Sequence, residues 1–368
     1  MRTAGIICEY NPFHRGHRHQ LRQVRQALGE DTGIVCLMSG NFVQRGEPAI
    51  WDKSLRAAAA LEAGADLVLE LPITGALGSA GDFADRAVGY LGRLGLVDYL
   101  CFGSEGPGTR ELMDCAAYLE SREFQEKLRQ RLQEGVSFAR ARELAAGEWG
   151  RCLQRPNSAL GVDYCRGILR RGETMEPLAL PRDLSLPSAT TLREELLDRG
   201  EGSLHSLAYG QRAMLGILRS LPRERFEEMA LGSEGLWSRV YRACREENSL
   251  EEIILACKSK RYAYARLRRG LMCLCLGLGR EEMALESPYL RVLGFGPRGR
   301  ELLHQGKKRT CLVAGPAPNT REAKAYGALE DRSARLYPLF ARELEPWIPD
   351  KSRKPKIFTE PLDFGEKP

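Results

Sequence analysis

The chain has 368 residues, of which 43% are hydrophobic and 28% are charged, and its mean hydropathy is -0.36. This composition is typical of a water-soluble globular protein with enough apolar side chains for two domains. The sequence contains no apolar run of about eighteen residues and no charged leader with a small-residue cleavage site, so we expect neither a membrane span nor secretion.

Cysteine usage and charge give two further expectations. The 11 cysteines form no CxxC pair, and several lie inside apolar segments, which is typical of buried thiols in a reducing, cytoplasmic compartment. The balance of Lys and Arg against Asp and Glu is -1 over residues 1–110 and +7 over the remainder. We therefore expect a polyanionic partner to dock mainly on the later part of the chain.

The first half of the sequence alternates apolar runs with stretches of helical spacing. The runs occupy residues 3–10, 33–40, 66–72 and 97–105, and the helical stretches between them include 54–63 and 82–94. Apolar runs without alternation, separated by helices, predict an α/β fold with a parallel sheet. Unusual polar clusters follow all four runs (EYNPFHRGH, SGNFVQRGEP, ELP and FGSE), so we expect them to share one site at the carboxyl edge of the sheet.

The pattern changes near residue 200, where glycine, serine and charge cluster in DRGEGS. Helical spacing follows over residues 207–220, 236–247, 249–257 and 259–277, and strands are expected within 286–299 and 310–316. We predict a Rossmann-like catalytic domain over residues 1–200 and a mostly helical domain over 201–345. Residues 346–368, rich in Pro and Lys, are expected to be extended or poorly ordered.

The segment CEYNPFHRGHRHQ places three of the five histidines within six positions. A helix starting near Arg15 offers backbone N–H groups and a positive dipole to a phosphate, and Gly16 allows close approach of a nucleotide. His14 and His17, one turn apart, can donate to phosphate oxygens. A zinc site would need further ligands that the sequence does not supply, and a plain solvated helix start is the structural alternative.

A family resemblance rests on several motifs in order along the chain. EYNPFHRGHRHQL, MSGNFVQRGEPAIWDKSLRAAAAL, GADLVLELP, CFGSE, PNSALGVDY, SATTLR and SPYLRVLGF resemble the tRNA(Met) cytidine acetate ligase family. The strand, HxGH and helix arrangement is similar to that of the wider HIGH-type nucleotidylyltransferase superfamily. The resemblance implies a nucleotidylyltransferase fold and a two-step reaction. Acetate and ATP give acetyladenylate and pyrophosphate, and the acetyl group then passes to N4 of the wobble cytidine of elongator tRNA(Met).

The resemblance also implies the residues of the nucleotide site. His14 and His17 are the expected catalytic residues, since their donors would hold the negative charge that grows as pyrophosphate leaves. Asn157 has the alternative role of N-cap to the helix from Ser158, and only DLSLP separates Arg182 from the SAT motif. The expected ATP-binding residues are Ile7, Cys8, Glu9, Tyr10, Asn11, Pro12, Phe13, His14, Arg15, Gly16, His17, Arg18, His19, Gln20, Gly103, Asn157, Arg182, Ser188, Thr190 and Arg193. ATP is the expected co-substrate and brings Mg²⁺ with it; no dedicated protein metal ligand is expected.

Residues that follow the second apolar run have less specific expectations. Gln44, Arg45 and Glu47 are expected to shape the acetate or cytidine pocket, and Asp52 is expected to cap the next helix.

A candidate RNA-binding segment lies in KSKRYAYARLRRGLMCLCL, residues 258–276. Read as one helix, it has an apolar stripe through Tyr264, Leu267, Leu271 and Leu274. Lys258, Arg261 and Arg268 fall together on another face and are the expected tRNA phosphate contacts. A basic face that only meets solvent is the structural alternative.

Two other functions remain compatible with the sequence. One is a small-molecule nucleotidylyltransferase that makes a dinucleotide or a coenzyme precursor. The other is a tRNA-binding protein that keeps the nucleotide fold without catalysis, although the intact His14, Gly16 and His17 favour an enzyme. The oligomeric state does not follow from the sequence.

Overall fold

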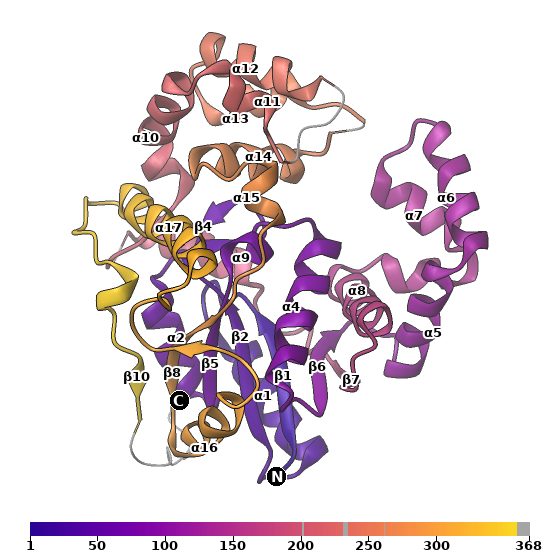
Figure 1. Ribbon diagram of the computed structural model, residues 1–368. Helices are drawn as coiled ribbons and strands as arrows, with labels where there is room; N and C mark the ends of the chain where they lie inside the picture. The colour runs from indigo at the N-terminus through magenta and orange to yellow at the C-terminus, as the bar shows by residue number, and fades with distance from the viewer. Residues whose placement is uncertain (201, 231–234, 261, 359–368) are drawn as a thin grey trace.

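The computed structural model describes residues 1–200, 202–230, 235–260 and 262–358. A sheet of eight strands carries helices on both faces, a group of helices covers one end, and a helical arm projects from one side (Figure 1). The strands are β1 (Thr3–Cys8), β2 (Gly33–Ser39), β3 (Phe42–Val43), β4 (Glu47–Pro48), β5 (Leu67–Leu71), β6 (Tyr99–Ser104), β7 (Glu176–Pro181), β8 (Leu290–Phe295), β9 (Leu312–Val313) and β10 (Lys356–Ile357).

The first half of the chain contributes nine α-helices. They are α1 (Arg15–Leu28), α2 (Lys53–Glu62), α3 (Ile73–Ala76), α4 (Ala80–Leu94), α5 (Thr109–Glu120), α6 (Arg122–Gln133), α7 (Phe138–Ala145), α8 (Pro156–Arg171) and α9 (Ala189–Arg199). The second half contributes α10 (Leu207–Ser220), α11 (Arg223–Glu227), α12 (Leu236–Glu246), α13 (Leu250–Cys257), α14 (Tyr264–Cys275), α15 (Arg280–Ala284), α16 (Pro297–Gly306) and α17 (Arg321–Leu336). These counts refer to the described ranges.

The strand order places the first strand at the centre of the sheet. The order is β10-β8-β5-β2-β1-β6-β7, with β9 on β8, and β3 pairs with β4 in a separate hairpin. The pairs β1/β2, β2/β5, β1/β6 and β6/β7 are parallel, whereas β8 is antiparallel to β5. The chain leaves β1 first toward β2 and later returns to its other side as β6. The carboxyl ends of β1 and β6 therefore form the switch point where ligands bind in open α/β sheets.

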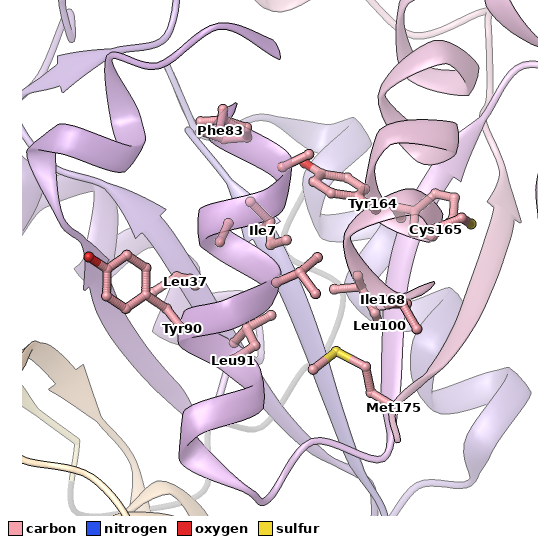
Figure 2. Close-up of a cluster of buried hydrophobic side chains, with 14 of the residues drawn as sticks. Ile7, Leu37, Phe83, Tyr90, Leu91, Leu100, Tyr164, Cys165, Ile168 and Met175 are labelled. Atoms are coloured by element: carbon pink, nitrogen blue, oxygen red, sulfur yellow. The ribbon is translucent and has the colours of Figure 1, made fainter. Parts of the chain in front are cut away.

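Two apolar layers enclose the sheet, as expected for strands buried on both faces. On one face Leu21 and Val24 of α1 and Ala57, Ala60 and Leu61 of α2 pack on β1 and β2. On the other face α4 and α8 pack on β1, β2 and β6, where Ile7, Leu37, Leu100, Phe83 and Tyr164 interdigitate (Figure 2). The four expected strands and the helices within 54–63 and 82–94 are confirmed.

Local caps explain several helix boundaries. Asp52 accepts the Ser54 N–H at 2.8 Å, so its expected capping of the next helix is confirmed. Ser79 and Asp82 form a capping box for α4, which ends at Gly95 in the left-handed conformation. Ser188 accepts the Thr191 N–H and starts α9.

A third apolar cluster belongs to the helices of the second half, referred to here as the helical lobe (α10–α14). The lobe lies over the carboxyl end of the sheet, and the arm (α5–α7) projects beside it (Figure 1). The mostly helical character expected after residue 200 is confirmed. The expected strands within 286–299 and 310–316 are present as β8 and β9. However, β8 lies inside the main sheet against β5, so residues 201–345 are not one separate body. The assignment of functions to the two segments stays a prediction.

The described part of the tail, residues 346–358, is mostly exposed and largely extended, apart from a short 3₁₀ helix at Asp350–Ser352. Asp350 is buried, and β10 pairs with β8. Residues 359–368, also part of the tail prediction, lie outside the described residues. Among the described residues, no helix is both long and apolar enough to cross a bilayer.

Candidate functional site

A cleft of about 460 Å³ opens at the carboxyl ends of β1, β6 and β7. Its lining combines segments that are far apart in the sequence. The lining residues are Ile7, Cys8, Glu9, Tyr10, Asn11, His14, Gly16, His17, His19, Gln20, Gln23, Gln44, Arg45, Glu47, Ala80, Phe83, Phe102, Gly103, Pro156, Asn157, Leu160, Tyr164, Pro181, Arg182, Asp183, Leu186, Pro187, Ser188, Ala189, Thr190 and Arg193. The cleft is thus polar on the side of α1 and α9 and largely apolar on the side of α4 and α8.

His14 and His17 form a reciprocal cap at the start of α1. The Gly16 N–H donates to His14 Nδ1 at 3.0 Å, and the His14 N–H donates to His17 Nδ1 at 3.3 Å. The rings stack with centroids 3.7 Å apart. Because each Nδ1 accepts a backbone hydrogen bond, the neutral tautomer of each ring carries its proton on Nε2. Both histidines are therefore fixed as Nε2–H donors without needing a positive charge.

The surroundings keep both rings neutral. Burial, and then the nearby Arg182 guanidinium, lower the pKa of His14 to about 4. Burial, followed by His14 and Arg182, holds the pKa of His17 well below its ordinary value. Tyr10 packs against the His17 ring with centroids 4.7 Å apart. An arriving phosphate would meet two neutral donors and one guanidinium.

Gly16 has a role that the sequence did not reveal. A Cβ at this position would lie 2.8 Å from His14 Cε1 and 3.0 Å from His14 Nδ1. The glycine is needed for the His14 ring to fold back over the helix start, in addition to any close approach of a nucleotide. This close approach explains why a glycine stands between the two histidines.

Gly103 and Arg182 lie together at the ends of β6 and β7. A Cβ at Gly103 would come within 2.8 Å of Arg182 Cγ, so the glycine makes room for the stem of the arginine. Arg182 Nη1 lies 3.3 Å from Glu105 Oε1. The arginine follows β7 and lines the cleft, despite the short DLSLP loop that leads to α9.

Glu105, which sequence reasoning did not single out, organises the start of α8. Its carboxylate accepts the Ser158 N–H at 2.9 Å, the Ser158 hydroxyl at 3.1 Å and the Asn157 amide group. These hydrogen bonds outweigh the effect of burial and lower the pKa of Glu105. Helix α8 begins at Pro156 with Arg155 as N-cap, so the alternative role of Asn157 as N-cap is wrong. Asn157 lies in the first turn and lines the cleft.

The SATTLR segment starts α9 and connects it to the loop after β1 and to β4 through a hydrogen bond and an ion pair. Ser188 caps α9. Thr190 and Arg193, one helical turn apart, both line the cleft. Arg193 donates to the Asn11 carbonyl at 2.7 Å and to Thr190 Oγ1 at 3.2 Å. Its guanidinium also lies 3.9 Å from Glu47 Oε1. The three predicted residues of this motif therefore line the same cleft as His14 and His17.

Comparisons with known proteins agree with this geometry. The model of the HIGH Nucleotidyl Transferase family matches residues 1–206 and 186–347. A tRNA(Met) cytidine acetate ligase of Thermoanaerobacter sp. (strain X514) is 35% identical over 355 residues, which cover 85% of this chain and 88% of that protein. The chain belongs to the tRNA(Met) cytidine acetate ligase family. A second member, from Caldicellulosiruptor saccharolyticus, is 34% identical over 95% of this chain and 96% of that protein.

A solved structure of similar fold carries a nucleotide. The crystal structure of Thermotoga maritima TmcAL bound with alpha-thio ATP superposes with a TM-score of 0.88 at 28% identity, over 98% of this chain and 100% of that one. The apo form of the same protein gives a TM-score of 0.87. The predicted α/β nucleotidylyltransferase fold is confirmed by these matches.

The structure brings most of the predicted ATP-binding residues together and leaves four outside. Pro12, Phe13, Arg15 and Arg18 do not line the cleft, although their neighbours in the sequence do. Gln44, Arg45 and Glu47 line it, as expected for residues that shape a pocket. The idea that all four strand-end clusters share one site is wrong for ELP, because Glu70 turns into a buried ion network with Lys53. The roles of the individual residues stay predictions.

The predicted helix over residues 258–276 is wrong at its start. Helix α13 ends at Cys257 with Lys258 as its C-cap, and α14 begins only at Tyr264; between them the backbones of Ser259 and Tyr262 are hydrogen-bonded to each other. Arg268 points toward the cleft, where its Nε donates to the Arg45 carbonyl at 2.8 Å and Nη1 lies 3.4 Å from Glu47. The common basic face does not exist for Lys258 and Arg268. Arg261 lies outside the described residues.

One buried arginine that the sequence did not reveal holds the strand ends in place. Arg56 of α2 is fully buried and donates to the carbonyls of Glu9, Ser39, Gly40 and Trp51. The first three of these carbonyls follow or end β1 and β2, so one guanidinium fixes both loops that lead into the cleft. A local sequence pattern cannot identify this role, because the partners come from separate segments of the chain.

Proposed function

We propose that the protein is an ATP-dependent ligase that activates acetate as acetyladenylate and transfers the acetyl group to N4 of the wobble cytidine of elongator tRNA(Met). The product would be N4-acetylcytidine. The observation that carries the proposal is the pair of neutral imidazoles fixed as Nε2–H donors in the cleft. It is supported by 35% identity to a tRNA(Met) cytidine acetate ligase over most of the chain.

In the first step an acetate oxygen attacks the α-phosphorus of ATP, and the bond to the bridging oxygen breaks as pyrophosphate leaves. Negative charge grows on the phosphate oxygens during this step. The Nε2–H groups of His14 and His17 and the guanidinium of Arg182 would stabilise that charge, and Arg193 would assist from α9, which lines the same polar side of the cleft. The donors are preorganised by the helix start, so little rearrangement is required.

In the second step the N4 amine attacks the carbonyl carbon of acetyladenylate, AMP leaves and one amine proton is released. The cytosine amine is a poor nucleophile because its lone pair is delocalised into the ring, so the mixed anhydride supplies the driving force. No covalent enzyme intermediate is needed. The apolar wall of Phe83, Phe102 and Tyr164 would shield the anhydride from water.

Mg²⁺ is expected to enter as the ATP complex and to neutralise phosphate charge. The carboxylates Glu9, Glu47 and Glu105 in and beside the cleft are each engaged by hydrogen bonds or arginines. Among the described residues no group of three or more His, Cys, Asp or Glu side chains is arranged as a metal site. The phosphates and water, rather than a protein cage, are the expected ligands.

The deciding experiment uses tRNA, ATP and labelled acetate with the purified protein, followed by mass spectrometry of the nucleosides. Labelled N4-acetylcytidine in tRNA(Met) is the expected result. In parallel, ATP–pyrophosphate exchange that depends on acetate would support the activation step. Exchange that depends on a nucleotide or phosphoester would favour a small-molecule nucleotidylyltransferase, and absence of exchange would favour a non-catalytic tRNA-binding protein.

A further inference from the structure

The solvent face of α1 carries three exposed arginines. Arg15, Arg18 and Arg22 make no ion pair and no side-chain hydrogen bond with any described residue. Their spacing of three and four residues places them on one face of the helix, over a length of about 10 Å. We refer to these residues as the α1 arginine strip.

Several other arginines near helix ends differ from the strip in having acidic partners. On the arm, Arg122 lies 2.9 Å from Glu126 and Arg140 lies 2.8 Å from Glu143. On α1 itself, Arg25 lies 3.0 Å from Asp66. The strip thus differs from these three arginines in having no acidic partner among the described residues.

The strip is also unfavourable for the helix that carries it. The first turn of α1 contains no acidic residue, and Arg15 and Arg18 lie at its positive end. A positive charge at a helix N-terminus opposes the helix dipole, and like charges three and four residues apart repel each other. A bound polyanion would relieve both effects.

The strip continues the mouth of the cleft. Arg15 follows His14 directly, and His17, His19 and Gln20 of the same helix line the cleft while the strip does not. Asp183, in the loop after β7, interacts with His19, and Glu30 and Asp31 follow the far end of α1. A nucleic acid whose base entered the cleft would keep its backbone outside, beside α1.

We propose that the α1 arginine strip binds phosphates of the tRNA strand that flanks the cytidine in the cleft. The inference rests on the proposed function and assigns an RNA surface to the first domain, whereas the charge balance of the sequence predicted docking mainly on the later part of the chain. It also replaces the ATP-binding role expected for the side chains of Arg15 and Arg18.

The test compares two triple variants with equal loss of charge. One changes Arg15, Arg18 and Arg22 to Ala. The matched control changes Arg300, Lys307 and Lys308 to Ala; these exposed residues lie in or directly after α16, which follows β8 at the amino end of β5 and does not line the cleft. A third protein with three Arg→Lys changes in the strip keeps the charge. Each is titrated with tRNA at several salt concentrations and assayed for acetate-dependent pyrophosphate exchange.

We expect the strip variant to bind tRNA at least about tenfold more weakly. The slope of log affinity against log salt concentration should become shallower by up to about 0.7–0.9 for each phosphate that is no longer neutralised. The control and the Arg→Lys protein should keep most of the affinity, and the strip variant should retain exchange. Equal affinity losses in both Ala variants, or unaltered tRNA affinity in the strip variant, would overturn the inference.

Two further outcomes separate the inference from the proposed function. Loss of exchange with intact tRNA binding in the strip variant would overturn the inference, because the arginines would then act on ATP and not on tRNA. Absence of exchange in the unmodified protein would instead refute the proposed function, and the titration would still decide the strip.

Discussion

At the scale of single residues, the HxGH segment depends on a contact between its own members. The imidazole of His14 folds back to accept the Gly16 N–H, and this is possible only because Gly16 lacks a Cβ. The same fold-back fixes the proton of His14 on Nε2, toward the cleft. We therefore expect the glycine to help position a donor, in addition to allowing close approach of a nucleotide.

Gly16→Ala should therefore reduce acetate-dependent pyrophosphate exchange by about 10- to 100-fold, since a displacement of about 1 Å in a catalytic group has effects of that size. The added methyl group would displace the His14 ring, whereas the fold should survive. The matched control is Gly216→Ala in α10, where a Cβ meets nothing within 4 Å and stability should rise by roughly 0.5–1 kcal/mol. Full exchange activity in the Gly16→Ala protein would contradict the positioning role.

His17→Ala should lower the exchange rate about a hundredfold or more, as for loss of an oxyanion donor. The far-ultraviolet circular dichroism should not change. His304→Ala, which alters an exposed histidine of α16, serves as the control and should be silent in both measurements. Unchanged exchange in the His17 variant with native circular dichroism would remove this residue from the phosphate site.

The low pKa of His14 predicts a pH dependence of stability. Its folded-state pKa of about 4 lies below the unfolded value of about 6.5, so between these values the unfolded chain binds a proton that the folded chain does not. Stability from this group is complete above about pH 6.5 and is lost as the pH falls toward about 4. The melting temperature of His14→Gln should therefore decline less than that of the unmodified protein between about pH 7 and about pH 4.5. Identical declines would show that the ring is not held neutral.

At the scale of helices and strands, the sequence predicted the elements whose apolar residues recur at a regular local spacing. The four apolar strands were recognisable because each is buried on both faces, and α1 begins at Arg15 as expected. The apolar stripe of Leu267, Leu271 and Leu274 is buried in the lobe, as its period indicated. What the pattern did not reveal was the start of that helix, since nothing in its local spacing marks a break before Tyr264.

The local sequence pattern also did not predict the direction of one charged side chain. The helical period predicts an outward-facing Arg268, but this side chain reaches the hairpin of β3 and β4, which packs tightly on α14. A Cβ at Gly46 would lie 2.6 Å from the Arg269 backbone, so only glycine permits this approach. Contacts between residues so far apart in the sequence have no signature in a helical period.

At the scale of the whole molecule, the division of charge along the sequence does not describe how charge is arranged on the surface. Some acidic residues of the first part are turned inward, where Asp66 pairs with Arg25 and Glu70 with Lys53. Each of these pairs removes one charge of either sign and leaves the net balance of -1 unchanged, so that balance does not show where charges of one sign, such as those of the α1 arginine strip, gather on one face. Charge counted along the chain omits this sorting, because burial depends on the fold.

The C-terminal tail shows the same limitation and leads to a prediction on stability. Its composition indicated an extended or poorly ordered segment, yet Asp350 is buried and lies 2.7 Å from Lys53 Nζ at the start of α2. Lys53 also bonds both oxygens of Glu70. Burial by itself lowers the pKa of Lys53, but Asp350 and Glu70 outweigh it and raise the pKa. The tail thus attaches to the sheet through a buried, charged contact.

Asp350→Asn should lower the free energy of unfolding by about 3 kcal/mol, the range for removing one partner of a buried ion pair, because Lys53 would keep its charge with one carboxylate fewer. Urea denaturation followed by circular dichroism measures the change. Lys351→Ala, at the neighbouring exposed position, is the control and should alter stability by less than about 0.5 kcal/mol. Because Asp350 does not line the cleft, exchange activity should persist wherever the variant is folded. A loss as small as that of the control would mean that the tail only rests on the sheet and contributes nothing to its stability through this ion pair.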